Sequence, residues 1–143
     1  MKLKIPLSRP SFCQKELDII DKVIKSEWLT HGEYNSKFES SFSKKFNLKH
    51  SLTLNSCTSA LELALKVFEI RGEVILPSFT WVSSANAIVN SGATPVFCDS
   101  DYKTRNINLD NIKKVFTKKT EAVMVVHFGG QSCEMDEISN FCK

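Results

Sequence analysis

The sequence is poor in glycine, and its 5 glycines form no GxGxxG phosphate-binding motif. A dinucleotide-binding Rossmann domain is therefore a weak candidate, with Gly129-Gly130 as the only adjacent glycine pair.

Long apolar runs are also missing. The longest, residues 122–126, is far too short for a membrane span, which needs about 20 apolar residues. A net charge of +3 is too small to indicate a nucleic acid partner. We expect neither a membrane nor a nucleic acid partner.

Paired metal-binding motifs are absent as well. The 5 cysteines include no CxxC pair, and the 3 histidines are equally scattered. No zinc-binding spacing results, so we expect no metal site. An odd number of thiols without a disulfide pattern fits a reducing compartment, which predicts a cytoplasmic protein.

The composition that remains is that of a globular protein. Hydrophobic residues make up 42% and charged residues 24% of 143 residues, the size of one ordinary domain. Apolar residues at helical spacing predict helices over residues 14–26, 34–46, 59–70 and 81–91, then one after Asn108 and one after Cys133. Strand-like runs cover residues 51–54, 73–76, 95–98 and 121–126. This alternation predicts an α/β fold, a mostly parallel sheet with helices on both faces.

Local signals predict how these helices begin and end. Gly72 is expected to end the helix over residues 59–70, and Gly92 the helix over residues 81–91. Ser78 or Thr80 is expected to cap the start of the latter, and Asn108 that of the next. In the helix over residues 34–46, Phe38, Phe42 and Phe46 share one face, which predicts a buried aromatic stripe.

The turn before residue 59 carries several hydroxyl groups. Ser56, Thr58 and Ser59 stand where a helix begins, and a helix start has unpaired N–H groups and the positive end of the helix dipole. Phosphate binds readily at such an end. Alternatively, Ser56 or Thr58 serves only as an N-cap, worth about 1 kcal/mol. The two roles are compatible.

The same stretch, Asn55-Ser56-Cys57-Thr58-Ser59-Ala60-Leu61, resembles the N-S-[GC]-T-[AS]-A-L motif of the DegT/DnrJ/EryC1/StrS family. That family consists of sugar aminotransferases that depend on pyridoxal 5'-phosphate (PLP). The similarity extends through most of the chain in the family's order, over Ile5-Pro6-Leu7-Ser8-Arg9-Pro10, Trp28-Leu29-Thr30-His31-Gly32, Leu76-Pro77-Ser78-Phe79-Thr80-Trp81-Val82, Gly92-Ala93-Thr94-Pro95-Val96-Phe97 and Val126-His127-Phe128-Gly129-Gly130-Gln131.

The resemblance implies a fold and a domain organisation. It implies the N-terminal part of the large domain of the aspartate-aminotransferase fold, fold type I of the PLP enzymes. Residues 1–143 then form a single partial domain. Within it, residues 1–50 are an N-terminal arm and helices, and residues 51–143 begin the PLP-binding large domain. A homodimer is also implied, since sites in this fold lie at a subunit interface.

The resemblance assigns the cofactor-binding residues Cys57, Thr58, Ser59 and Trp81. The Thr58 hydroxyl and the N–H groups of Thr58 and Ser59 would hold the phosphate. Trp81 would stack on the pyridine ring, although a Trp judged alone is more often a core or helix-staple residue. In the loop over residues 127–131, Gly129-Gly130 permits a tight turn near a ligand, and His127 is interpreted as structural.

The resemblance implies an aminotransferase that acts on a nucleotide-linked keto-sugar in the biosynthesis of cell-surface or secondary-metabolite sugars. Glutamate is the expected amino donor. The family's Schiff-base lysine and its pyridinium aspartate lie downstream of the matched segments, so no catalytic residue is assigned. We expect the 143-residue chain to be inactive alone. The alternatives are a truncated, non-catalytic member of the family, or a PLP-dependent sugar dehydrase, in which histidine replaces the lysine.

Overall fold

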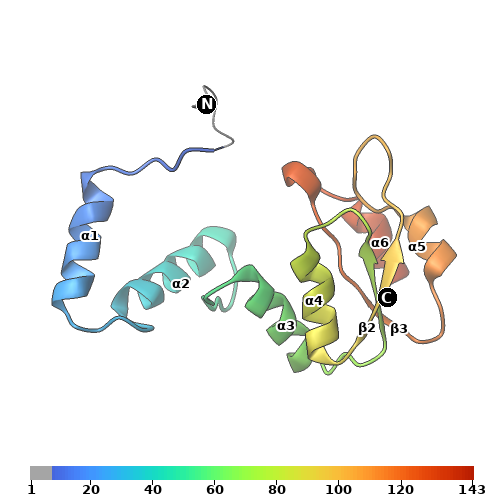
Figure 1. Ribbon diagram of the computed structural model, residues 1–143, viewed down its shortest axis with the longest axis horizontal. Coiled ribbons are helices and arrows are strands. Elements are labelled where there is room, and N and C mark those ends of the chain that lie inside the picture. Colours follow the sequence, from blue (N-terminus) through green and yellow to red (C-terminus); the bar gives the residue numbers. More distant parts are fainter. Residues whose placement is uncertain (1–7) are drawn as a thin grey trace, which may run out of the picture. The chain divides into compact units, whose positions relative to one another are not determined.

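The computed structural model describes residues 8–143 (Figure 1). Two compact units follow one another, the first ending at Thr53 and the second running from Leu54 to Lys143. The segment Ile5-Pro6-Leu7 of the family resemblance lies outside the described residues, as does most of the expected N-terminal arm. The grouping of residues 1–143 into one partial domain, divided after residue 50, stays a prediction.

The first unit contains two helices, α1 (Gln14–Lys25) and α2 (Glu33–Phe46). Both match the predicted ranges to within one residue at each end. The predicted burial of the aromatic stripe is wrong, because all three phenylalanines of α2 are exposed. They contact one another instead, with ring centroids 5.9 Å apart for Phe38 and Phe42 and 4.5 Å apart for Phe42 and Phe46.

The predicted strand over residues 51–54 does not form. Its backbone binds a side chain of α2 rather than another strand. The N–H and the hydroxyl of Thr53 both donate to Oε1 of Glu39, each over 2.7 Å. The Ser51 hydroxyl donates to the Glu39 carbonyl oxygen over 3.2 Å. The run is apolar enough to form a strand, but its Thr53 N–H is already hydrogen-bonded to the Glu39 carboxylate.

This carboxylate is expected to make the first unit sensitive to acid. Hydrogen bonds from the Thr53 N–H, the Thr53 hydroxyl and His31 lower the pKa of Glu39 from 4.5 to about 2. A lowered pKa in the folded state stabilises it above pH 4.5, and that stabilisation is lost as the pH falls from 4.5 towards 2. Glu39→Gln is therefore expected to remove part of the acid sensitivity of the first unit. Circular dichroism from pH 6 to about pH 2 measures it, and identical acid transitions in both proteins would contradict the assignment.

The second unit is the α/β part of the chain. In order, it contains α3 (Cys57–Val67), β1 (Glu73–Pro77), α4 (Val82–Ser91), β2 (Thr94–Cys98), α5 (Leu109–Val115), β3 (Thr120–Val123), η1 (Phe128–Gly130) and α6 (Met135–Phe141). The strands are all parallel, in the order β2-β1-β3. In this register Ile75 pairs with Val96 on one side and Val123 on the other. The prediction of an α/β fold with a parallel sheet is confirmed.

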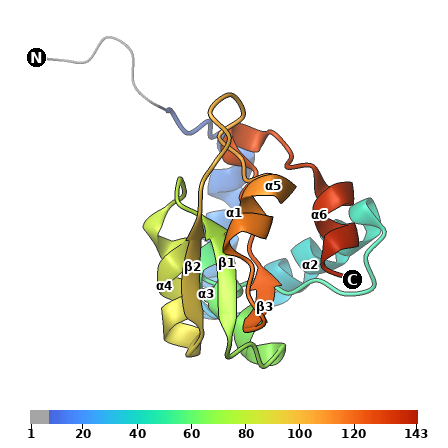
Figure 2. The same ribbon diagram turned by 90° about the vertical axis from the view of Figure 1, so that its right-hand side faces the viewer.

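Helices cover both faces of this sheet (Figure 2). Side chains alternate along β1, because successive residues of a strand face opposite sides. Ile75 packs in a core with α5 and α6, while Val74 and Leu76 pack in a second core with α3 and α4. All three are fully buried. Because both faces of the central strand are buried, its sequence is a continuous apolar run from Val74 to Leu76.

The ends of the helices confirm two of the predicted signals. Gly92 ends α4 with a left-handed backbone, at φ 90°. Asn108 caps α5 through a hydrogen bond from the Asn111 N–H to its Oδ1 over 2.9 Å. The cap predicted at Ser78 or Thr80 is wrong. Trp81 is the N-cap residue of α4 and makes no side-chain cap bond.

Gly72 does not end α3. That helix stops at Val67, and Glu69 takes the left-handed conformation at φ 56°. The N–H of Ile70 then donates to the Leu65 carbonyl over 3.0 Å, which closes a Schellman motif. A Cβ on Gly72 would lie 2.5 Å from the Lys119 carbonyl oxygen, so this glycine allows a close approach of two backbone segments.

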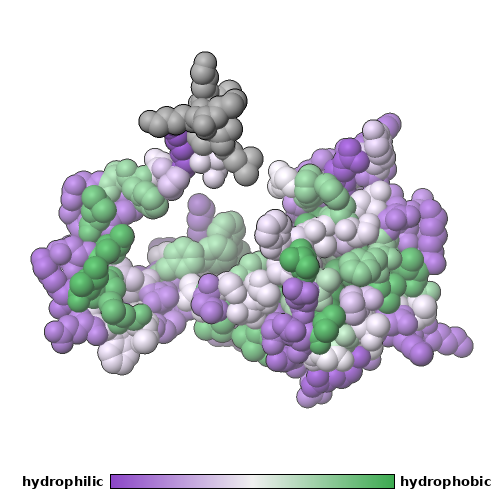
Figure 3. Space-filling model, in the orientation of Figure 1, coloured by the Kyte–Doolittle hydropathy of each residue, from purple (hydrophilic) through white to green (hydrophobic). Residues whose placement is uncertain are grey.

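Among residues 8–143, no helix is both long enough and apolar enough to span a bilayer. Apolar side chains do reach the surface of each unit (Figure 3). In the second unit the most exposed of them include Trp81, Phe68 and Val82.

Candidate functional site

Three loops of the second unit lie towards the carboxyl ends of the strands. Helix α3 ends shortly before β1 begins and α4 starts shortly after β1 ends, so both run against the strand. Their N-terminal ends therefore lie on the same side, together with the loop that follows β3. In parallel α/β sheets this is the edge at which ligands bind. The predicted residues Cys57, Thr58, Ser59 and Trp81 all stand here.

The start of α3 carries a set of hydrogen-bond donors. Cys57, Thr58 and Ser59 are its first three residues, and Ser56 is the N-cap. The Ser56 hydroxyl oxygen accepts from the Ser59 N–H over 3.1 Å and lies 2.9 Å from the Ser59 hydroxyl oxygen. The capping interpretation of Ser56 is thus confirmed, and it uses the Ser59 N–H that was predicted to hold phosphate.

Three further donors at this helix start have no intramolecular partner among residues 8–143. Within the described part of the chain, neither the N–H of Cys57, nor the N–H of Thr58, nor the Thr58 hydroxyl has a hydrogen-bond partner. Two N–H groups and a hydroxyl at the positive end of a helix dipole suit an oxyanion such as a phosphate group. The donor chemistry therefore fits the phosphate of the cofactor.

Trp81 stands at the start of the neighbouring helix α4. Its side chain is 79% exposed, and it belongs to neither core of the second unit. The two ends of its turn are fixed, since the Ser78 N–H donates to the Cys98 carbonyl over 2.8 Å and the Thr80 hydroxyl lies 3.0 Å from that of Ser84. A large aromatic ring is thus exposed at this edge of the sheet.

The third loop, after β3, is a tight turn. Gly129 and Gly130 both have positive φ, at 61° and 84°. The Cys133 N–H donates to Nδ1 of His127 over 3.1 Å, which supports a structural role for this histidine. The Phe128 ring packs on Phe79 with centroids 4.8 Å apart. The structure therefore joins the third loop to the turn that carries Trp81.

Sequence reasoning missed Asn106, which binds this third loop from the loop after β2. Its side chain is almost fully buried, and both ends of its amide are hydrogen-bonded to the backbone of residues 128–131. Such a contact joins residues more than 20 positions apart, so a local pattern does not reveal it. The only local sign of it in the sequence is the position of Asn106, a polar residue directly before the apolar Ile107 and two residues before Asn108, which caps α5.

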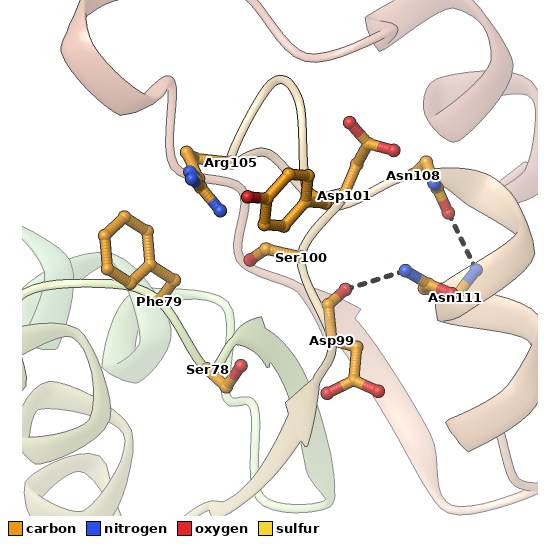
Figure 4. A pocket seen from close by; sticks show the side chains of 9 residues that line it. Ser78, Phe79, Asp99, Ser100, Asp101, Arg105, Asn108 and Asn111 are labelled. Atoms are coloured by element: carbon orange, nitrogen blue, oxygen red, sulfur yellow. Dashed lines mark hydrogen bonds between the residues drawn. The ribbon is translucent and has the colours of Figure 1, made fainter.

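A cavity of about 530 Å³ lies beside the predicted site, between the loops that follow β1 and β2 (Figure 4). Its lining includes Phe79, Asp99, Ser100, Asp101 and Arg105. The Arg105 guanidinium lies 4.6 Å from the centroid of the Tyr102 ring. The N–H groups of Thr104 and Lys103 lower the pKa of Asp101, whose carboxylate is thereby occupied in its own loop. None of the four predicted residues lines this cavity.

No cluster of three or more metal-binding side chains occurs among the residues that the structure describes. The five cysteines are all free, and two of them, Cys98 and Cys133, are buried. Burial raises the pKa of both thiols. Both thiols pack in the core formed with Ile75 and α5.

Comparison with known proteins identifies the family. The profile of the DegT/DnrJ/EryC1/StrS aminotransferase family matches residues 10–143, and the chain belongs to this family. The chain is 43% identical over 136 residues to the spore coat polysaccharide biosynthesis protein SpsC of Bacillus subtilis (strain 168), covering 94% of the chain and 35% of SpsC. It is 37% identical over 142 residues to the GDP-perosamine synthase of Escherichia coli O157:H7, covering 97% of the chain and 39% of the synthase.

The fold agrees with this assignment. The structure is similar to the Spr1654 protein of Streptococcus pneumoniae in its PLP form, with a TM-score of 0.89 and 32% sequence identity. The match covers 95% of this chain and 35% of Spr1654. The chain thus spans between 35% and 39% of the length of these three relatives.

Proposed function

We propose that this chain supplies the phosphate-binding and ring-binding part of a PLP-dependent aminotransferase. The observation that carries the proposal is the start of α3. There, two N–H groups and the Thr58 hydroxyl have no partner in the described chain, within a motif that matches the family. When bound, PLP would supply an electron sink for amino-group chemistry. The residues of this chain would bind and orient it.

Each predicted residue has a distinct part in this proposal. The N–H groups of Cys57 and Thr58 and the Thr58 hydroxyl would hold the phosphate. Ser59 would act through the Ser56 cap, since its N–H and hydroxyl both contact the Ser56 hydroxyl. Trp81 would cover one face of the pyridine ring, where stacking is worth on the order of 1 kcal/mol beyond the buried area.

The proposed substrate is a nucleotide-linked keto-sugar, with glutamate as the amino donor. Support comes from the relatives, since one is a GDP-perosamine synthase and another a spore coat polysaccharide biosynthesis protein. We further propose a homodimer in the cytoplasm. The free cysteines, two of them in the core, support a reducing compartment.

The test of this proposal is PLP binding at Trp81. Trp81→Ala is expected to weaken PLP binding by about fivefold, because one face of the ring loses its stacking partner. The melting temperature without ligand is expected to stay nearly unchanged, since the side chain is largely exposed. Equilibrium dialysis, read by PLP absorbance, gives the affinity, and calorimetry gives the melting temperature.

Tyr102→Ala is the matched control, because it removes another highly exposed aromatic ring of the same unit. It is expected to leave PLP affinity unchanged. If Trp81→Ala lowers the melting temperature strongly but leaves PLP affinity unchanged, Trp81 is a packing residue.

A further inference from the structure

The side chain of Asn106 holds the loop after β3 at two points. Its Oδ1 accepts from the Phe128 N–H over 2.9 Å, and its Nδ2 donates to the Gln131 carbonyl over 2.9 Å. Only 4% of the residue is exposed. Hydrogen bonds at such a buried site meet little competition from water. The Phe128 N–H also donates to the Val126 carbonyl over 3.1 Å, whereas the Gln131 carbonyl has no other partner among residues 8–143.

Asn106 is itself fixed in place. Its carbonyl accepts from the Asp101 N–H over 2.8 Å, and its own N–H donates to the Thr104 hydroxyl over 3.3 Å. The amide therefore projects from a loop that is already closed by hydrogen bonds. Among side chains of this size, only Asn offers both a donor and an acceptor in one planar group.

The loop that Asn106 holds has backbone hydrogen bonds of its own, from the Gly130 N–H to the His127 carbonyl over 3.0 Å and from the Gln131 N–H to the Phe128 carbonyl over 3.1 Å. These short-range bonds do not tie it to the loop after β2. Between the two anchor points lie Gly129 and Gly130, and a Cβ on either would meet no atom within 4 Å. Glycine also loses the most conformational freedom on ordering. The two amide bonds of Asn106 thus supply a restraint that packing does not.

This restraint reaches the turn that carries Trp81. Phe128, whose N–H is bound by Asn106, packs on Phe79 with centroids 4.8 Å apart. Phe79 precedes Trp81 by two residues, in a turn whose ends are fixed at Ser78 and Thr80. The contact between the two phenyl rings therefore links the loop over residues 127–131 to that turn.

We propose that Asn106 is a positioning residue for the cofactor edge: it fixes the loop over residues 127–131, and through Phe128 and Phe79 it fixes the orientation of Trp81. The coupling between Asn106 and Trp81 is a property of the protein without ligand. Its consequence for PLP affinity rests on the proposed function.

The first test uses the protein without ligand. Asn106→Leu removes both amide bonds with little change in side-chain volume. The Phe128 N–H is then expected to exchange with deuterium about tenfold faster, because it loses the buried Asn106 acceptor and keeps only the local Val126 carbonyl, 3.1 Å away. In a Trp28→Phe background, the remaining indole N–H signal in the NMR spectrum is that of Trp81, and it is expected to shift or broaden. The matched control is Ile112→Ala, which destabilises the core that contains Ile107, the residue after Asn106, but leaves both amide bonds in place.

A second variant keeps the proposal testable if Asn106→Leu does not fold. Phe79→Ala breaks the ring contact and leaves the amide bonds in place. It is expected to move the Trp81 signal while the Phe128 N–H stays protected. The proposal is overturned if the Trp81 signal in Asn106→Leu or in Phe79→Ala matches that of the Ile112→Ala control.

The PLP arm is read separately. Asn106→Leu is expected to weaken PLP binding by about threefold to tenfold, whereas Ile112→Ala leaves it within twofold. Equal affinities in Asn106→Leu and Ile112→Ala would overturn the positioning role. If the wild-type protein binds no PLP, the proposed function is contradicted but the positioning role of Asn106 is not. The exchange and indole measurements are made without ligand, so they still decide whether Asn106 fixes the turn.

Discussion

Ile75→Ala is expected to lower the free energy of unfolding of the second unit by about 3–5 kcal/mol. Ile75 is the middle residue of the central strand, fully buried, and pairs with both neighbouring strands. Its side chain contacts the core formed with α5 and α6. Removing three carbons there loses their transfer free energy and leaves a cavity that a β-sheet cannot close by moving one strand.

Two further variants calibrate this result. Ile75→Val removes one methylene group and is expected to cost about 1 kcal/mol. Val89→Ala shortens an exposed side chain of α4 and is expected to change stability by no more than about 0.5 kcal/mol. Urea unfolding followed by circular dichroism measures all three. A cost for Ile75→Ala below that of Ile75→Val would mean that Ile75 is not the centre of this core.

The sheet was predictable because its strands are apolar on both faces. Residues 73–76 were expected as a strand, and β1 differs only by including Pro77. The predicted run over residues 121–126 was too long. β3 ends at Val123, although the Met124 N–H still donates to the Ile75 carbonyl over 2.7 Å. Apolar composition locates a strand well. The last residue of the strand, however, depends on how far the neighbouring strand continues to provide hydrogen-bond partners.

Hydrogen bonds between residues far apart in the sequence explain the error at residues 51–54 and the place of Gly72. Residues 51–54 have the composition of a strand, but the Thr53 N–H donates to the carboxylate of Glu39, 14 positions earlier. The end of α3 was expected at Gly72, yet Glu69 adopts the left-handed conformation that glycine favours. Gly72 is instead needed where Glu121 approaches and accepts from its N–H over 2.9 Å. The contacts of Thr53 with Glu39 and of Gly72 with Glu121 join residues 14 and 49 positions apart, so no local pattern reveals them.

The candidate site divides in the same way. Thr58 and Trp81 could be singled out because a helix start and a matched motif are local features. Their binding roles stay predictions. Asn106 could not be found, because its partners are Phe128 and Gln131, and only the fold brings them together. A sequence motif therefore reveals the predicted binding residues, but it does not reveal a residue that supports them from a distant part of the chain.

Thr58→Val is expected to weaken PLP binding by about tenfold or more. Valine keeps the shape and the β-branch of threonine but removes the hydroxyl, so one hydrogen bond to the phosphate dianion is lost. Such a charge-assisted bond is worth about 1.5–3 kcal/mol. The helix itself is expected to tolerate the change, since Ser56 and not Thr58 provides its cap.

The measurement compares two ligands and two variants. PLP affinity is obtained by equilibrium dialysis for the wild type, Thr58→Val and Thr58→Ser, where the last retains the hydroxyl and is expected to bind within about threefold of the wild type. Pyridoxal, which lacks the phosphate, is expected to bind wild type and Thr58→Val equally weakly. Inorganic phosphate is expected to compete with PLP less well in Thr58→Val. If Thr58→Val binds PLP as tightly as the wild type, or if the loss is the same for pyridoxal, the phosphate does not lie at the start of α3, because only a contact to the phosphate separates the two ligands.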